Sequence, residues 1–198
     1  MKTTIGRSST RIAAIFATLG LAACASTGST PPMPGAFSIS SSAFADGTLM
    51  PVRFAGNTKG NANCVGQNIS PPFAWSNVPA GTQSLALVMV DPEGRGGLGV
   101  DHWVAYGINP SMGGFAEGET SQLSNRYVGG KGLAGVGHYL GPCTPAMTGY
   151  HHYTFTLIAT DFAPDALPAS LTREQLMARL AGHTKGSAGL VGLFGRDK

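Results

Sequence analysis

Short apolar segments bounded by turn residues constrain the fold of this chain more than any other feature. Residues 85–90 read LALVMV, residues 103–108 read WVAYGI and residues 153–160 read YTFTLIAT; the first two stop at Asp-Pro and Asn-Pro pairs. Such short aliphatic, aromatic and β-branched segments are typical of strands, and proline interrupts a ladder. We therefore predict a mainly β protein with antiparallel sheets, with weaker strands over 37–42 and 50–54.

Helical signals are few. Thr172 and Gln175 have the spacing of a capping box, and a mildly amphipathic stretch follows to about Ala181, where Gly182 can end it. Residues 111–142 are rich in glycine and serine without a clear period, so we predict a long irregular loop there. The predicted architecture is antiparallel sheet with one or two short helices.

The N-terminus has the features of an export signal. Its basic start contains no acidic residue, and residues 12–21 form an apolar run that ends in Leu-Ala-Ala before Cys24. The run is too short to span a bilayer comfortably, which takes about 20 residues. Cys24 in this setting resembles the acylated cysteine of bacterial lipoproteins, so residues 1–23 are a predicted lipoprotein signal peptide. An ordinary cleaved signal followed by an incidental cysteine is the alternative.

The remaining chain divides into a tether and one domain. Residues 24–36 consist mostly of Ser, Thr, Gly and Pro, which cannot build a packed core, so we predict a flexible tether. Residues 37–198 are the predicted domain. The formal charge of +3 comes from the three cations of the signal, and the mature chain has ten basic and ten acidic residues. This balance gives no indication of a nucleic-acid partner.

Polar residues lie where the predicted strands begin or end. Asp91 follows one strand, His102 precedes the next, and His151-His152 precede Tyr153 in a third. Histidines at strand ends can meet at one rim of a sheet, where imidazolium and backbone N–H groups suit a small anion such as phosphate. His151 and His152 point to opposite faces of an extended segment, so they do not chelate one ion easily. We find no short-range metal motif and predict neither metal nor cofactor.

Several ordered motifs resemble one family. They are QNISPPFAW at 67–75, VDPE at 90–93, HWVAYGI at 102–108, YLGPCTP at 139–145 and GYHHYTFTLIATD at 149–161. They are similar to motifs of the phosphatidylethanolamine-binding protein (PEBP) family, in its bacterial branch of Raf kinase inhibitor-like proteins. The resemblance implies a β-rich fold with a shallow pocket for phosphate-like head groups. On the matching positions, the pocket would be lined by Asp91, His102 and His151, with a wall made by Tyr153 and the turn from Pro142 to Pro145.

The chain departs from the family pattern beside that pocket. Glu93 stands where the family has Asp, Thr144 replaces the first Pro of a pair, and His152 replaces Arg. These changes leave two points open: the shape of the pocket edge after Asp91, and which group, if any, makes the pairing that the family's arginine would make.

Two classes of function follow. The favoured one is a membrane-anchored envelope protein that binds a phosphate-like anion or phospholipid head group, with a protein partner such as a protease or a kinase-like enzyme as a further expectation. The rival is a hydrolase-type enzyme that uses His102, His151 and Asp91 for acid–base chemistry. A scaffold with a vestigial pocket is a third alternative. Ala25 after Cys24 resembles the pattern for delivery to the outer membrane, with the domain facing the periplasm.

Two cysteines, Cys64 and Cys143, lie in the predicted domain. An oxidising compartment and an even count make a disulfide plausible, and two separate thiols are the alternative.

Overall fold

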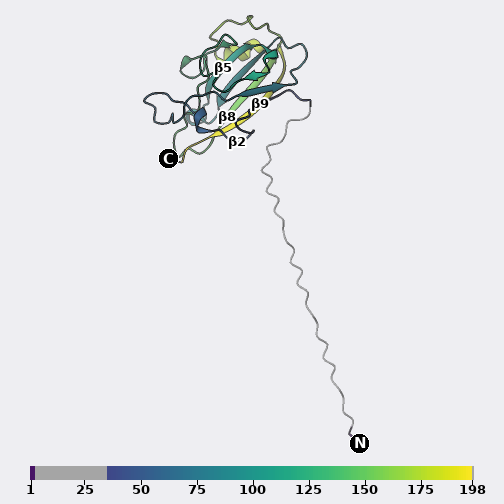
Figure 1. Ribbon diagram of the computed structural model, residues 1–198, viewed down its shortest axis with the longest axis vertical. Helices are drawn as coiled ribbons and strands as arrows, with labels where there is room; N and C mark the ends of the chain where they lie inside the picture. Colours follow the sequence, from purple (N-terminus) through teal and green to yellow (C-terminus); the bar gives the residue numbers. More distant parts are fainter. Residues whose placement is uncertain (3–34, 198) are drawn as a thin grey trace.

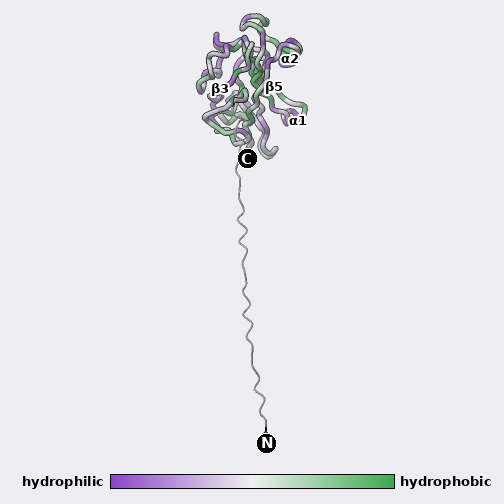
Figure 2. Tube along the Cα trace, turned by 90° about the vertical axis from the view of Figure 1, so that its right-hand side faces the viewer, coloured by the Kyte–Doolittle hydropathy of each residue, from purple (hydrophilic) through white to green (hydrophobic). Residues whose placement is uncertain are grey.

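The protein is built from two sheets and a helical layer. The computed structural model describes residues 1–2 and 35–197. A six-stranded sheet has the order β2-β9-β8-β4-β5-β7, and a three-stranded sheet has the order β1-β3-β6 (Figure 1). Figure 2 shows β3 on one side of β5 and the two α-helices on the other. The prediction of a mainly β fold with one or two short helices is confirmed.

The elements are mostly short. The strands are β1 (Ser38–Ser40), β2 (Thr48–Leu49), β3 (Phe73–Ser76), β4 (Ser84–Asp91), β5 (Val100–Ile108), β6 (Gly114–Phe115), β7 (Val128–Gly129), β8 (His151–Thr160) and β9 (Thr184–Phe194). The helices are α1 (Gly94–Gly97) and α2 (Arg173–Leu180), with 3₁₀ turns η1 (Val52–Phe54), η2 (Pro110–Met112) and η3 (Leu133–Gly135).

The six-stranded sheet is buried on both faces. Along β4, Leu87 and Met89 join a core between the two sheets, whereas Ala86 and Val88 join a second core that contains Leu176 of α2. Successive strand residues point to opposite faces, so a strand covered on both sides needs apolar residues throughout. This explains the unbroken apolar sequence of residues 85–90.

A β-bulge between β4 and β5 places His102 on the side of the core between the sheets. Met89 pairs with Trp103 but Val90 pairs with Asp101, so His102 is the extra residue. Simple alternation would send neighbouring residues to opposite faces, whereas a bulge re-aims one of them. Trp103 lies in the core between the sheets, and the His102 ring contacts Tyr153 of the same core.

The structure corrects the prediction of a strand over 50–54. Pro51 precedes the 3₁₀ turn η1, and the Phe54 N–H donates to the Pro51 carbonyl over 3.0 Å. Proline fixes φ near its helical value and has no N–H for a ladder, so it begins a turn more readily than it continues a strand. The short strand β2 before it pairs in parallel with β9, the one exception to antiparallel pairing among the named strands of the described residues.

The predicted helix is confirmed as α2. The Thr172 side chain accepts from the Gln175 N–H, and the Gln175 side chain accepts from the Thr172 N–H, which completes the capping box. The element α1 is an irregular turn, because Arg95 and Gly96 have left-handed φ values of 54° and 68°. The predicted loop over 111–142 contains only short elements.

A disulfide joins two loops that are distant in sequence. Cys64 and Cys143 are bonded across a separation of 79 residues, with Cα atoms 4.4 Å apart. In the chain-entropy model, closing a loop of this length stabilises the folded state by about 4–5 kcal/mol. The bridge fixes the start of the segment that leads into β8.

The predicted signal peptide, Cys24 and nearly all of the predicted tether lie outside the described residues. Within the described part of the chain, no helix has the length and apolar character needed to cross a membrane.

Candidate functional site

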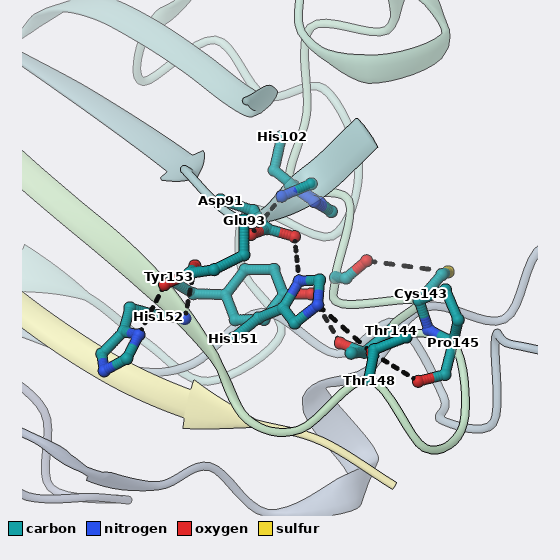
Figure 3. A network of polar contacts seen from close by, with 12 residues as sticks. Asp91, Glu93, His102, Cys143, Thr144, Pro145, Thr148, His151, His152 and Tyr153 are labelled. Atoms are coloured by element: carbon teal, nitrogen blue, oxygen red, sulfur yellow. Dashed lines mark hydrogen bonds and ion pairs between the residues drawn. The ribbon is translucent and has the colours of Figure 1, made fainter. Parts of the chain in front are cut away.

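The polar residues predicted from the strand ends meet at one end of the six-stranded sheet. Asp91 ends β4, His151 begins β8, and His102 is near the start of β5. Because β4 is antiparallel to both neighbours, its last residues lie beside the first residues of β5 and β8. Figure 3 shows the three side chains gathered around Tyr153 (Figure 3).

Asp91 and His151 form a buried pair. The His151 Nδ1 atom lies 2.8 Å from Asp91 Oδ2, and Asp91 Oδ1 accepts from the Gly94 N–H over 2.9 Å. The residues are only 4% and 7% exposed. A carboxylate is an acceptor only, so Nδ1 of His151 is the donor and its ring orientation is fixed. His151 is therefore at the end of the sheet, as predicted, but it is buried there and held by its hydrogen bond to Asp91.

His102 is held as a neutral ring with one defined tautomer. It is 3% exposed, and burial lowers its pKa, an effect that the Leu140 carbonyl and the charges of Asp91 and Asp101 only partly offset. Its Nδ1 atom lies 2.9 Å from the Leu140 carbonyl oxygen, which can only accept. The proton is therefore on Nδ1, and Nε2 presents a lone pair when the ring is neutral.

Tyr153 forms the floor between the two histidines. Its ring is 5.2 Å from His102 in an edge-on arrangement and 6.4 Å from His151 in a stacked one. Its hydroxyl is 2.7 Å from Thr144 Oγ1, and burial raises its pKa, so the phenol stays protonated. Thr144, which departs from the family pattern, thus replaces a proline ring with a hydrogen bond to Tyr153.

The segment after the disulfide lies against the outer edge of His151. Thr148 Oγ1 is 3.3 Å from His151 Nε2, and the same hydroxyl donates to the Pro145 carbonyl over 2.8 Å. Pro142 is buried, and its carbonyl accepts from the Gly56 N–H over 2.8 Å. Of the two predicted wall prolines, Pro145 is therefore the one linked by hydrogen bonding to the histidine cluster.

Two of the departures from the family pattern pair with each other. The Glu93 carboxylate accepts from the His152 N–H over 3.0 Å and lies 2.7 Å from its Nδ1. Burial tends to raise the pKa of Glu93, but the bonds from His152 outweigh it and lower the pKa overall. His152 is exposed while His151 is buried, so the prediction that these histidines face opposite sides is confirmed.

A separate groove lies near the same strands. It has a volume of about 470 Å³ and is lined by Val90, Asp101, Lys131 and Arg173 among others, but by none of the cluster residues. The polar cluster and this groove are therefore separate parts of the surface.

Comparison with known proteins agrees with the fold and the motifs. A family model described as phosphatidylethanolamine-binding protein matches residues 40–195. The chain belongs to this family. Among its relatives, "Putative lipoprotein LppC" of Mycobacterium tuberculosis H37Rv is 42% identical over 167 residues, which cover 83% of this chain and 76% of the relative. A UPF0098 protein of Methanothermobacter thermautotrophicus is 37% identical over 67% of this chain and 87% of its own length.

Solved structures of family members have the same fold. YbcL of Escherichia coli, described as a new member of the mammalian PEBP family, superposes with a TM-score of 0.71 at 24% identity and covers 80% of this chain and 98% of its own. A PEBP homologue from Chlamydia trachomatis, CT736, superposes with a TM-score of 0.68 at 30% identity and covers 81% and 97%.

The structure brings together Asp91, His102, His151 and Tyr153, as the family motifs suggested. Sequence reasoning missed Thr148, whose hydroxyl contacts the His151 edge, and the Leu140 carbonyl, which fixes the His102 tautomer. A single threonine in a loop has no sequence pattern that marks it as a site residue, and a backbone carbonyl is common to every residue type.

Buried His102 makes stability depend on pH. Its folded pKa lies below the unfolded value of about 6.5, so the unfolded chain binds the proton more readily. The contribution of neutral His102 is complete above about pH 6.5 and is lost as pH falls toward the folded pKa. His102→Asn keeps a donor for Leu140 but cannot titrate, so it should show a weaker loss of stability in acid. Urea unfolding of both proteins between about pH 5 and pH 8 measures this; parallel pH profiles would contradict it.

Proposed function

We propose that this member of the PEBP family is a membrane-anchored envelope protein that binds a phosphate-like anion or phospholipid head group at the cluster of Asp91, His102 and His151. The observation that carries the proposal is the fixed orientation of His151. Asp91 holds its Nδ1, so that Nε2 is directed at an oxygen atom, Thr148 Oγ1.

The contact with Thr148 indicates how an anion would be held. The Thr148 hydroxyl donates its proton to the Pro145 carbonyl, so its oxygen is free to accept from a protonated His151 Nε2. An oxygen of a phosphate group has the same acceptor chemistry and adds charge, which makes the hydrogen bond stronger. Thr148 therefore occupies a position that a ligand oxygen can take over.

His102 couples this binding to protons. When neutral, its Nε2 offers a lone pair and disfavours an anion, because Nδ1 holds the proton for Leu140. Protonation turns Nε2 into a donor, and a nearby anion raises the pKa of His102. Affinity is then greatest below the free pKa of His102 and falls as pH rises through the pKa of the complex.

The rival proposal, a hydrolase, draws on the same geometry. Asp91, His151 and Thr148 are ordered like a carboxylate, a base and a hydroxyl nucleophile. However, the Thr148 proton is directed at Pro145 over 2.8 Å, a better hydrogen bond than the 3.3 Å contact with His151. The Thr148 oxygen is thus arranged to accept a hydrogen bond from His151 and not to give up its own proton to it, which favours binding over catalysis.

Anchoring is part of the proposal. The Leu-Ala-Ala-Cys pattern and the name of the relative LppC support acylation of Cys24, and Ala25 supports delivery to the outer membrane. Several acyl chains on one residue would make the attachment stable. Growth with a labelled fatty-acid analogue should label wild type but not Cys24→Ala. An unlabelled wild-type protein would contradict the anchor.

The binding site is tested with His151→Asn, which keeps a donor for Asp91 and removes the edge that faces Thr148. Calorimetric titration with glycerophosphoethanolamine should show affinity weaker by roughly 1–3 kcal/mol, the scale of one charge-assisted hydrogen bond. The matched control His152→Asn alters the neighbouring exposed histidine and should bind almost as wild type. Equal binding by wild type and His151→Asn would place the ligand elsewhere.

A further inference from the structure

A second carboxylate, that of Glu93, lies beside the cluster of Asp91, His102 and His151. Asp91 and Glu93 both contribute carboxylates, whereas burial keeps His102 neutral. One ligand atom each from Asp91, Glu93 and His151 lie within 4.8 Å of one another, and two of the three residues are buried. Two carboxylates and an imidazole are a donor set that divalent transition metals bind.

The geometry points to a divalent cation site, of the kind that takes Zn²⁺, formed by Asp91 Oδ2, a Glu93 carboxylate oxygen and His151 Nδ1. Zinc bonds to nitrogen and oxygen are about 2.0–2.2 Å long, so tetrahedral ligand atoms lie about 3.3 Å apart. Asp91 Oδ2 and His151 Nδ1 are 2.8 Å apart, so the two side chains must move apart by about half an ångström for both atoms to bind the ion. Glu93 reaches it by leaving exposed His152, whose N–H then bonds to water.

The outer contacts of such a site already exist. Ligating carboxylates and imidazoles are usually held by further hydrogen bonds on their other atoms. Asp91 Oδ1 accepts from the Gly94 N–H over 2.9 Å, and His151 Nε2 lies 3.3 Å from Thr148 Oγ1. A metal on His151 Nδ1 requires the neutral ring to carry its one proton on Nε2: a ring that starts with the proton on Nδ1 gives it to water and takes one up on Nε2, where Thr148 Oγ1 accepts the hydrogen bond. Three protein ligands leave a fourth position for water or an anion oxygen.

His102 lies next to this donor set without belonging to it. The residue is 3% exposed, its recorded hydrogen bond among residues 1–2 and 35–197 is the one from Nδ1 to Leu140, and Nε2 is not among the fully buried unpartnered atoms, so solvent or a ligand can reach it. The Leu140 carbonyl keeps the proton on Nδ1, so Nε2 presents a lone pair, the form in which histidine binds metals. In Figure 3 its ring lies on the same side of the site as Asp91, whose charge acts on it.

A second Asp–His pair in the chain serves as an internal comparison. His183 Nδ1 is also 2.8 Å from a carboxylate oxygen, that of Asp161. There the other carboxylate oxygen is bound by Lys185 Nζ at 2.7 Å, and the pair is largely exposed. A cation already neutralises that carboxylate, so we expect zinc to choose the Asp91 cluster.

The test is calorimetric titration of the purified full chain with Zn²⁺, after removal of metals with EDTA. Wild type should bind one ion saturably, and Glu93→Gln should weaken binding at least about tenfold, the scale on which disturbed metal sites lose affinity. Glu93 is partly exposed, so this variant should keep the wild-type circular dichroism spectrum. His183→Asn is the matched control and should bind zinc as wild type does.

His152→Asn distinguishes the proposed ligands from the exposed Glu93–His152 pair. Freed from His152, Glu93 should bind zinc at least as well as in wild type. No saturable binding, unchanged affinity in Glu93→Gln, or loss of binding in His152→Asn or His183→Asn would overturn the site. Titration with glycerophosphoethanolamine in the presence of EDTA separates this result from anion binding, because that affinity should be the same in Glu93→Gln and wild type.

Discussion

The buried contact between Asp91 and His151 is the interaction on which the site depends. It links the last residue of β4 to the first residue of β8, two strands that are 60 residues apart in sequence at this point. Removing one partner of a buried hydrogen bond typically destabilises a protein by roughly 1–3 kcal/mol, because the other group is left buried without a partner. The same contact fixes the tautomer and direction of the His151 ring, so stability and ligand recognition rest on one hydrogen bond.

Two irregular features, a β-bulge and a disulfide, place the other residues of the site around this pair. The bulge in β5 turns His102 toward Tyr153, and the disulfide between Cys64 and Cys143 holds the segment that carries Thr144 and Thr148. A regular sheet would leave His102 on the opposite face, and a free segment would have to be ordered again when a ligand binds. The sheet provides a rigid base, and the bulge and the bridge place the functional groups on it.

Much of the fold could be predicted from the sequence, because β4, β5 and β8 are apolar runs bounded by turn residues and α2 has its capping box. Strand β9 could not, since its glycines at 186, 189 and 192 suppress the strand pattern. A Cβ at Gly192 would be 2.5 Å from the Met50 side chain, which would have to move. At the site, residue spacing left only weak candidates, and the family motifs selected Asp91, His102 and His151. The Glu93–His152 pair and the Thr148 contact arise from tertiary packing, which local sequence does not encode.

The central claim is that Asp91 and Leu140 fix the two imidazole rings so that their Nε2 atoms receive the ligand. Nitrogen-15 NMR of the histidine side chains, recorded with and without phosphate, tests it most directly. We predict that Nδ1 is protonated in both His102 and His151 in the free protein, and that phosphate shifts the Nε2 signals of these rings but not those of His183. Phosphate that leaves both rings unchanged, or a His102 ring protonated only on Nε2, would contradict the account.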